Sequence, residues 1–336
     1  MRRHMRLIHG IVLTICMLVL EPGSSARAES CDQLFPDITC SERAARPANS
    51  AMPMSFPYIF EDPYIATGLN LVGIWHQFPS NSLPGGGDLG VLALQARLAI
   101  TDRLAFIATK DGVGFYRPDR NSVLRDDNGF FNITAGLKYA LWQWSDGDES
   151  AIFTPSLRYE IPSGSREIYQ GSGTGLLIPA LSSAYQNGNW HVIGGVGGHA
   201  PLDHDKNGSN FFYNLHIDHA FPTGNETFRF IVPFIELSGI RYTGDGDGSQ
   251  KAKTSALNTV TVKAATTVLG LAPFEGVDVA NLGSDRVRGN DLVTMAWGVR
   301  VPIGNSLNFG LSYERPLSNV KDLFDQRITA MLTWEL

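Results

Sequence analysis

The feature that most constrains the fold is an alternation of apolar and polar residues with a period of two, which runs from about Thr67 to the end of the chain. It is clearest at the C-terminus, where Ile328, Ala330, Leu332, Trp334 and Leu336 alternate with mostly polar residues. Successive side chains of a β-strand point to opposite faces, so this pattern predicts strands with one apolar and one polar face. The same alternation recurs at 131–141, 210–218 and 307–314. We therefore expect an all-β fold.

The connections between the predicted strands alternate between short and long. Tight turns are expected at Thr101–Arg103, Asn187–Asn189 and Gly304–Ser306. The longer polar links are Pro79–Gly87, Asp111–Gly129, Pro162–Thr174, Ala200–Ser209, Thr243–Asn290 and Pro316–Asp325. This arrangement is typical of a single closed antiparallel transmembrane β-barrel, here of about 12 strands, with short periplasmic turns and long extracellular loops. The alternative is a soluble β-sandwich or periplasmic barrel, which has no reason to sort its connections by length.

The N-terminus has the pattern of an export signal. Three arginines precede an apolar run, Leu7–Leu20, and Ala26-Arg27-Ala28 has the small-x-small form of a signal-peptidase site. We expect residues 1–28 to be a signal peptide, 29–66 a periplasmic N-terminal arm with a disulfide and a linker, and 67–336 the outer-membrane barrel. The protein is therefore expected in the outer membrane of a Gram-negative cell.

The charge and the cysteine content of the chain indicate which kinds of partner and which cellular compartment to expect. The formal net charge of the whole chain is -6, and removal of residues 1–28 takes away more basic than acidic side chains. An acidic chain without a basic face excludes nucleic acid as a partner. Cys31 and Cys40 are the two cysteines outside the signal, and in an oxidising compartment we expect them to form one disulfide.

If the apolar faces of the strands contact lipid, the charged residues between them line the lumen. Charges in the lumen can set the selectivity of a pore, or they can pair and brace a filled interior. Pro233 predicts a bulge that turns Glu236 inward, because the simple alternation would leave this carboxylate in lipid. The candidate lumen residues are Arg97, Lys138, Arg158, Glu160, His216, Asp218, Arg229, Arg300 and Glu314.

The best candidates for chemistry are His216 and Asp218, which share one face of a strand because they are two residues apart. They could act as a general base and its orienting acid, with Ser156 or Ser312 as the nucleophile. This pair is the basis of an alternative function, an outer-membrane hydrolase. A hydrogen-bond network in the lumen explains the same residues, so we assign no catalytic residue.

A second short motif suggests a metal ion. Asp203, Asp205 and Asn207, followed by Gly208, place oxygen ligands at every second position, as at the start of a calcium loop. The closing acid of such a loop is missing, because Asn214 stands at its position. Calcium at the extracellular loops is a weak hypothesis, and no other cofactor is expected.

Several short motifs resemble a known family. They are Ile161-Pro162-Ser163-Gly164, Gly171–Gly175, Tyr185–Trp190, Pro233–Gly239, Asn281–Ser284 and Tyr313–Leu317. Together they resemble the outer-membrane transporter family associated with phenol meta-cleavage pathways (MetA-like), over roughly Thr67–Leu336. The resemblance implies a barrel of about twelve strands that transports small, apolar or aromatic molecules and is inserted by the barrel assembly machinery.

These observations favour a passive channel or porin for uptake or efflux of small molecules, with no enzymatic activity. The expected partners are outer-membrane lipids, a small-molecule solute and the barrel assembly machinery. The alternatives are the hydrolase described above and a structural barrel with a closed lumen.

Overall fold

The structure is a computed structural model that describes residues 44–119, 122, 124–171, 173–249, 251–252, 260–270, 286–319 and 324–336. Its largest sheet contains β1 (Gly68–Gln77), β2 (Gly87–Ala99), β3 (Leu104–Lys110), β4 (Val113–Pro118), β5 (Asp127–Phe130), β6 (Ile133–Tyr139), β7 (Trp142–Asp146), β8 (Glu149–Ile161), β9 (Leu176–Asn187), β10 (Trp190–Pro201), β11 (Asn210–His219), β12 (Phe221–Pro222), β13 (Phe230–Tyr242), β16 (Asp291–Ile303), β17 (Leu307–Pro316) and β18 (Gln326–Glu335). The smaller elements are the 3₁₀ turn η1 (Arg166–Ile168), the hairpin strands β14 (Lys251–Ala252) and β15 (Val260–Thr261), and the helix α2 (Val262–Leu269).

The sheet closes on itself. β1 pairs antiparallel with β2 on one side and with β18 on the other, from Gly68 opposite Glu335 to Gln77 opposite Gln326. Three of the barrel strands are interrupted and consist of more than one element. β3 and β4 both pair with β2, and β6 and β7 both pair with β8. β12 extends the strand of β11, because it pairs with the same neighbour, β13. The result is a closed barrel of 12 antiparallel strands, as the sequence predicted.

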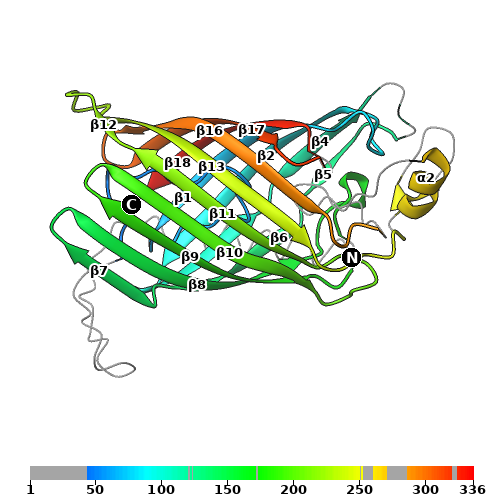
Figure 1. The fold of residues 1–336 in the computed structure, drawn as a ribbon, viewed down its shortest axis with the longest axis horizontal. Helices are drawn as coiled ribbons and strands as arrows, with labels where there is room; N and C mark the ends of the chain where they lie inside the picture. Colours follow the sequence, from blue (N-terminus) through cyan, green and yellow to red (C-terminus); the bar gives the residue numbers. More distant parts are fainter. Residues whose placement is uncertain are drawn as a thin grey trace, which may run out of the picture. The chain divides into compact units, whose positions relative to one another are not determined.

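Short turns and long loops lie at opposite ends of the barrel (Figure 1). We call these the turn end, where the chain also terminates, and the loop end, where α2 lies. The predicted long link Asp111–Gly129 differs in detail, because it contains β4 and most of β5, which extend the barrel wall toward the loop end. Among the described residues, no helix has the length and hydrophobicity needed to cross a membrane.

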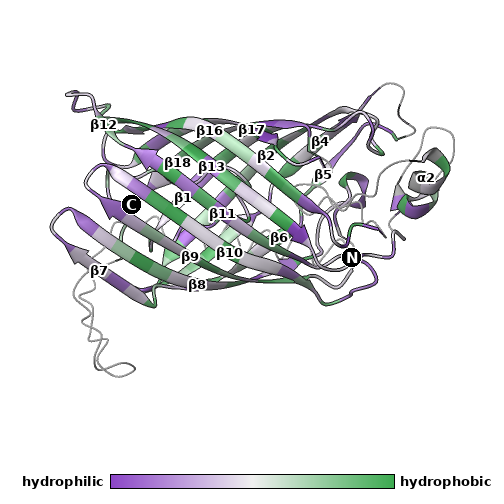
Figure 2. Ribbon diagram, in the orientation of Figure 1, coloured by the Kyte–Doolittle hydropathy of each residue, from purple (hydrophilic) through white to green (hydrophobic). Residues whose placement is uncertain are grey.

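The outer face of the barrel carries a band of exposed apolar side chains. Figure 2 shows that hydrophobic residues are frequent along the strands. Large apolar surfaces of this kind are rare on soluble monomers and are typical of contact with lipid. Members of the band include Leu71, Leu94, Leu137, Leu157, Leu215, Ile235, Leu311 and Leu332.

The predicted bulge at Pro233 is wrong. β13 keeps a continuous register with β16 through Pro233 opposite Val299, and Glu236 is buried by simple alternation. The phase of the strand was misread because the inward neighbours of Glu236, Val232 and Phe234, are themselves apolar.

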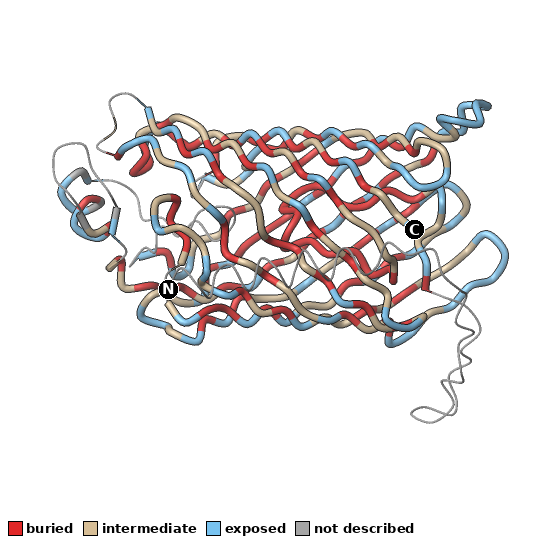
Figure 3. The backbone as a smooth tube through the Cα atoms, turned by 180° about the vertical axis from the view of Figure 1, so that it is seen from behind, coloured by how far each residue is buried: buried red, intermediate tan, exposed pale blue. Residues whose placement is uncertain are grey.

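The interior of the barrel contains the N-terminal segment 44–66, which we call the plug. The two ends of the plug lie side by side, because Ile65 N–H donates to Ala44 O (2.7 Å). Ala44 N–H in turn donates to Asp102 O in a short turn between strands (3.2 Å). Nearly all residues from Ser50 to Ile65 are buried (Figure 3). The sequence had assigned this segment to a periplasmic arm and linker, whereas the structure places its described part in the lumen.

Candidate functional site

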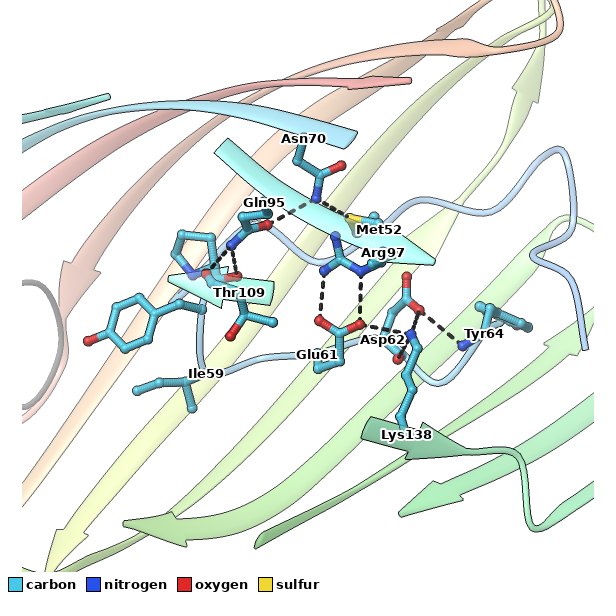
Figure 4. Close-up of polar contacts among 12 residues, drawn as sticks. Met52, Ile59, Glu61, Asp62, Tyr64, Asn70, Gln95, Arg97, Thr109 and Lys138 are labelled. Atoms are coloured by element: carbon cyan, nitrogen blue, oxygen red, sulfur yellow. Dashed lines mark hydrogen bonds and ion pairs between the residues drawn. The ribbon is translucent and has the colours of Figure 1, made fainter. Parts of the chain in front are cut away.

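The plug is fixed at the turn end by a buried acidic pair, Glu61 and Asp62 (Figure 4). Arg97 binds Glu61 through two hydrogen bonds, Nε–Oε1 at 2.9 Å and Nη2–Oε2 at 2.7 Å. Lys138 Nζ contacts Glu61 Oε1 at 2.8 Å and Asp62 Oδ1 at 3.2 Å, and Arg46 also pairs with Asp62. Burial alone would raise the pKa of Glu61, but Arg97 and Lys138 outweigh it and hold this pKa well below its usual range. Two inward cations of the wall are thus neutralised by acids of the plug.

Peptide carbonyls of the plug also accept hydrogen bonds from side chains of the wall. Arg158 donates to Tyr58 O (2.5 Å) and Ile59 O (3.1 Å), and Gln95 Nε2 donates to Pro57 O (2.6 Å). These contacts supply the partners that buried backbone groups need when they form no regular ladder. They make the plug an integral part of the lumen.

A second polar cluster binds the plug from the opposite wall. His216 lies between two carboxylates, with Nε2 at 2.8 Å from Asp218 and Nδ1 at 2.7 Å from Glu236, while His191 contacts Asp218 at 2.5 Å. Glu236 accepts the backbone N–H of Met54 (2.8 Å), and that of Ser55 (2.5 Å).

The predicted proximity of His216 and Asp218 is therefore found, but the arrangement differs from that of a hydrolase. A general base needs one ring nitrogen free to accept a proton from the nucleophile. Both ring nitrogens of His216 face carboxylate oxygens, and its side chain is fully buried against Phe234. His216 therefore has no ring nitrogen left for a nucleophilic serine, and the cluster serves to hold the plug.

The other predicted lumen residues lie as follows. Glu160 faces inward and binds Lys110 (3.1 Å) and Asn132 (2.6 Å). Glu314 accepts a hydrogen bond from Thr294 (2.6 Å), and Arg300 is fully buried on β16. Arg229 lies outside the strands, in the turn before β13, and donates to Gly304 O (3.2 Å). A role of these residues in selectivity remains a prediction.

The loop half of the lumen has a different lining. Beside the buried pairs Lys110–Glu160 and Arg327–Glu314, many of its inward side chains are apolar and form one buried cluster with the tip of the plug. Inward members of this cluster on the strands are Val72, Ile74, Leu89, Val91, Tyr116, Leu176, Ile178, Phe212, Ile240, Tyr242 and Leu292.

Within this half, aromatic rings form a continuous chain of contacts down to the plug. Centroid distances along the chain are Tyr169–Tyr116 5.3 Å, Tyr116–Phe78 5.5 Å, Phe78–His76 5.2 Å, His76–Phe324 5.0 Å and Phe324–Phe56 5.9 Å. At its lower end the guanidinium of Arg327 lies 4.5 Å from the Phe324 ring and 5.3 Å from the Phe56 ring. The four contacts nearest the loop end have tilted or edge-to-face geometries that aromatic pairs prefer.

The remaining sequence hypotheses are not decided by the structure. Cys31 and Cys40 lie outside the described residues. In the loop after β10, Asp203 Oδ1 accepts the backbone N–H of Asp205 (3.2 Å). Among the described residues, no group of three or more His, Cys, Asp or Glu side chains is placed to hold a metal ion.

Sequence reasoning missed the residues of the plug, above all Glu61 and Asp62. A signal was present, because Phe56, Tyr58, Phe60 and Tyr64 make this stretch too aromatic for a solvated linker. It also missed Lys110, which follows a register shift between Ala108 and Lys110 and so leaves the alternation of β3.

Comparison with known proteins gives structural matches only. No protein-family model matches the chain. No curated protein sequence matches it either. Among solved structures, the chain is similar to an outer membrane channel from Pseudomonas putida F1, with 13% identity over 85% of this chain and 100% of that one and a TM-score of 0.49. It is also similar to the NanC porin (6% identity, 80% and 100% coverage, TM-score 0.45) and to LpxR from Salmonella typhimurium (10% identity, 80% and 100% coverage, TM-score 0.43). At these values the matches assign neither a family nor a function.

Proposed function

We propose that the protein is an outer-membrane channel that passes small apolar or aromatic molecules and is closed in this structure by its plug. The exposed apolar band supports a place in the membrane, since a closed barrel satisfies its backbone internally and can present apolar side chains to lipid. Export by residues 1–28, insertion by the barrel assembly machinery and membership of the MetA-like family belong to the same proposal.

The observation that carries the proposal is the apolar, aromatic lining of the loop half of the lumen. A barrel needs apolar residues on its outer face only, and a lumen for ions or sugars is polar. Here Tyr116, Phe212 and Ile178 face inward as well and are almost completely buried. Such a lining favours entry of apolar solutes, because transfer of apolar surface from water into it is favourable by about 25 cal/mol per Å².

The plug explains why the lumen is filled in this structure. It is attached at two polar clusters on opposite walls, and the Met54 side chain packs against Gly310, where a Cβ would lie 2.5 Å from the sulfur and Met54 would have to shift. The plug must shift for a solute to pass, and ion pairs and hydrogen bonds with the wall can re-form afterwards. We therefore assign it the role of a gate.

The test is solute flux into liposomes that contain the purified protein, with toluene as the apolar solute and glycerol as the polar one. We expect toluene to enter faster than in protein-free liposomes and glycerol to show little change. Phe212 and Phe211 provide a matched pair, since they are adjacent but 1% and 45% exposed, on opposite faces of β11.

Replacement of the inward ring by F212Q should lower toluene flux, and F211Q should leave it unchanged. Absence of flux for both solutes, together with absence of conductance in planar bilayers, would indicate a structural barrel instead. If the two substitutions had equal effects on toluene flux, toluene would not pass through the lumen.

A further inference from the structure

A cavity of about 160 Å³ lies at the turn end, between the plug and the wall formed by β16–β18. By the same measure one water molecule needs roughly 10–15 Å³, so the cavity can hold a small ligand. The plug contributes Arg46, Ser50 and Met52 to its lining, and the turn before β17 contributes its other side. A solute that leaves the lumen along the plug passes this cavity.

The charged residues of the lining are three arginines, Arg46, Arg229 and Arg300, and one glutamate, Glu335. Arg46 uses its charge within the protein, because it pairs with Asp62 and, at 3.3 Å, with Glu335. Among the residues that the structure describes, the two remaining arginines have no carboxylate partner. The cavity therefore has an excess of positive charge.

Arg300 is the residue that most requires an additional partner. It is fully buried, and within the described part of the chain its guanidinium has three hydrogen-bond contacts: Asn308 Oδ1 (3.3 Å), Thr333 Oγ1 (3.2 Å) and the sulfur of Met331 (2.8 Å). Among the described residues, no carboxylate lies within ion-pair distance of it, and its Nε has no acceptor. Burial of a cation without a counter-charge is costly unless an anion binds to it.

Arg229 provides a second unused donor at the same cavity. Its Nη2 donates to Gly304 O, but its buried Nε has no acceptor in the described part of the chain. A planar carboxylate accepts hydrogen bonds from two guanidinium groups at once, and the buried apolar lining residues Met52 and Pro302 suit a hydrocarbon body.

We propose that this cavity binds the carboxylate group of a small apolar acid, held by Arg300 and Arg229. The inference rests on the proposed function and names its substrate class: molecules with an apolar body, which the loop half of the lumen accepts, and one carboxylate, which the turn end binds.

The test is isothermal titration calorimetry of the full-length mature protein in detergent, with benzoate as the probe. Benzyl alcohol has the same ring without the charge, and inorganic phosphate has charge without the ring. We expect benzoate to bind and the other two probes to bind at least about tenfold more weakly, the ratio expected from one charge-assisted hydrogen bond.

The variants R300Q and R229Q should each weaken benzoate binding by about tenfold or more. R229Q keeps the test decisive if R300Q does not fold, because Arg229 lies in a turn and not in the wall. The control R241Q, at an exposed ion pair with Asp291 near the loop end, should bind benzoate as the unmodified protein does.

Three results would overturn the proposal: no binding of benzoate, equal binding of benzoate and phosphate, or equal affinity of R300Q, R229Q and R241Q for benzoate. This measurement is independent of transport. Benzoate binding without flux in liposomes would contradict the proposed channel and leave the site standing, whereas toluene flux without benzoate binding would do the reverse.

Discussion

The two halves of the lumen are filled by different kinds of contact. In the turn half, the inward cations Arg97 and Lys138 meet acids and a carbonyl of the plug. In the loop half, the wall presents apolar and aromatic side chains that pack against each other and against the tip of the plug.

The difference shows that an inward position in this barrel is not by itself polar. The turn half needs the plug, because its buried charges would otherwise lack partners in a confined space. The loop half also contains buried charges, but these pair within the wall, as Lys110 does with Glu160 and Arg327 with Glu314, and its remaining apolar contacts can be exchanged for one another. A solute that replaces side-chain contacts there meets less resistance than one that must separate ion pairs.

The largest expected effect on the docking of the plug comes from replacing Glu61 in the turn half. E61Q leaves Arg97 and Lys138 without their shared carboxylate, and loss of one partner of a buried pair costs about 3–5 kcal/mol. We expect weaker docking of the plug, faster hydrogen exchange over 44–66 and more frequent opening in planar bilayers. Since the pKa of Glu61 is lowered, its contribution is present at neutral pH and is lost as the pH falls through that low value.

The control for this prediction is E226Q, in the exposed turn before β13. It removes the same charge at the same end of the barrel without touching the plug. Unchanged exchange and unchanged opening in E61Q, relative to E226Q, would contradict the view that the acidic pair closes the lumen.

A slightly smaller effect, on the stability of the barrel in lipid, is expected from a substitution on its outer face. Leu157 is 55% exposed near the middle of β8, and a cation there would lie in hydrocarbon at a cost of about 2–4 kcal/mol. L157R should therefore unfold at lower denaturant concentration in lipid. Leu202 is equally exposed, at 54%, but lies in a loop, so L202R should be nearly neutral.

Much of this comparison could be predicted from the sequence. The period of two in β18 and the order of short and long connections were sufficient for the closed barrel, because alternation and connection length are local properties. Eight of the nine predicted lumen residues do lie on inward faces of strands, with Arg229 as the exception.

The plug could not be predicted from alternation, because it has no regular structure of its own. The predicted lumen set nevertheless contained a hint: its cations, Arg97, Lys138, Arg158, Arg229 and Arg300, outnumber its acids. Buried cations require acids from elsewhere, and the aromatic-rich segment before the first predicted strand contains an acidic pair, Glu61-Asp62. The apolar lining of the loop half was missed for a different reason, since residues such as Ile240 and Leu292 on an inward face look the same in the sequence as residues that face lipid.

A third effect is expected where the aromatic chain of the loop half is interrupted. Tyr116 contacts both Tyr169 and Phe78 edge to face, and each such pair contributes about 0.5–1.5 kcal/mol beyond burial. Y116L keeps an apolar side chain but loses both ring contacts. In liposomes it should lower the flux of toluene relative to that of cyclohexane, while F115L, on the outer face, should leave this ratio unchanged. An identical ratio in both variants would show that the rings serve packing alone.

The smallest predicted effect is at Ser238, the hydroxyl of which contacts the hydroxyl of Ser55 on the plug at 3.1 Å. One neutral hydrogen bond contributes about 0.5–1.5 kcal/mol, so S238A should raise the exchange rate of the plug by no more than roughly tenfold. Ser183 on β9 is exposed on the outer face, and S183A removes a hydroxyl without contact to the plug. If S238A weakened the docking of the plug as strongly as E61Q, neutral hydrogen bonds with the wall would contribute as much as the ion pairs. The contrast between charged and neutral contacts in the lumen would then be wrong. A difference of about two kcal/mol or more between the two variants is what a docking dominated by the buried acidic pair requires.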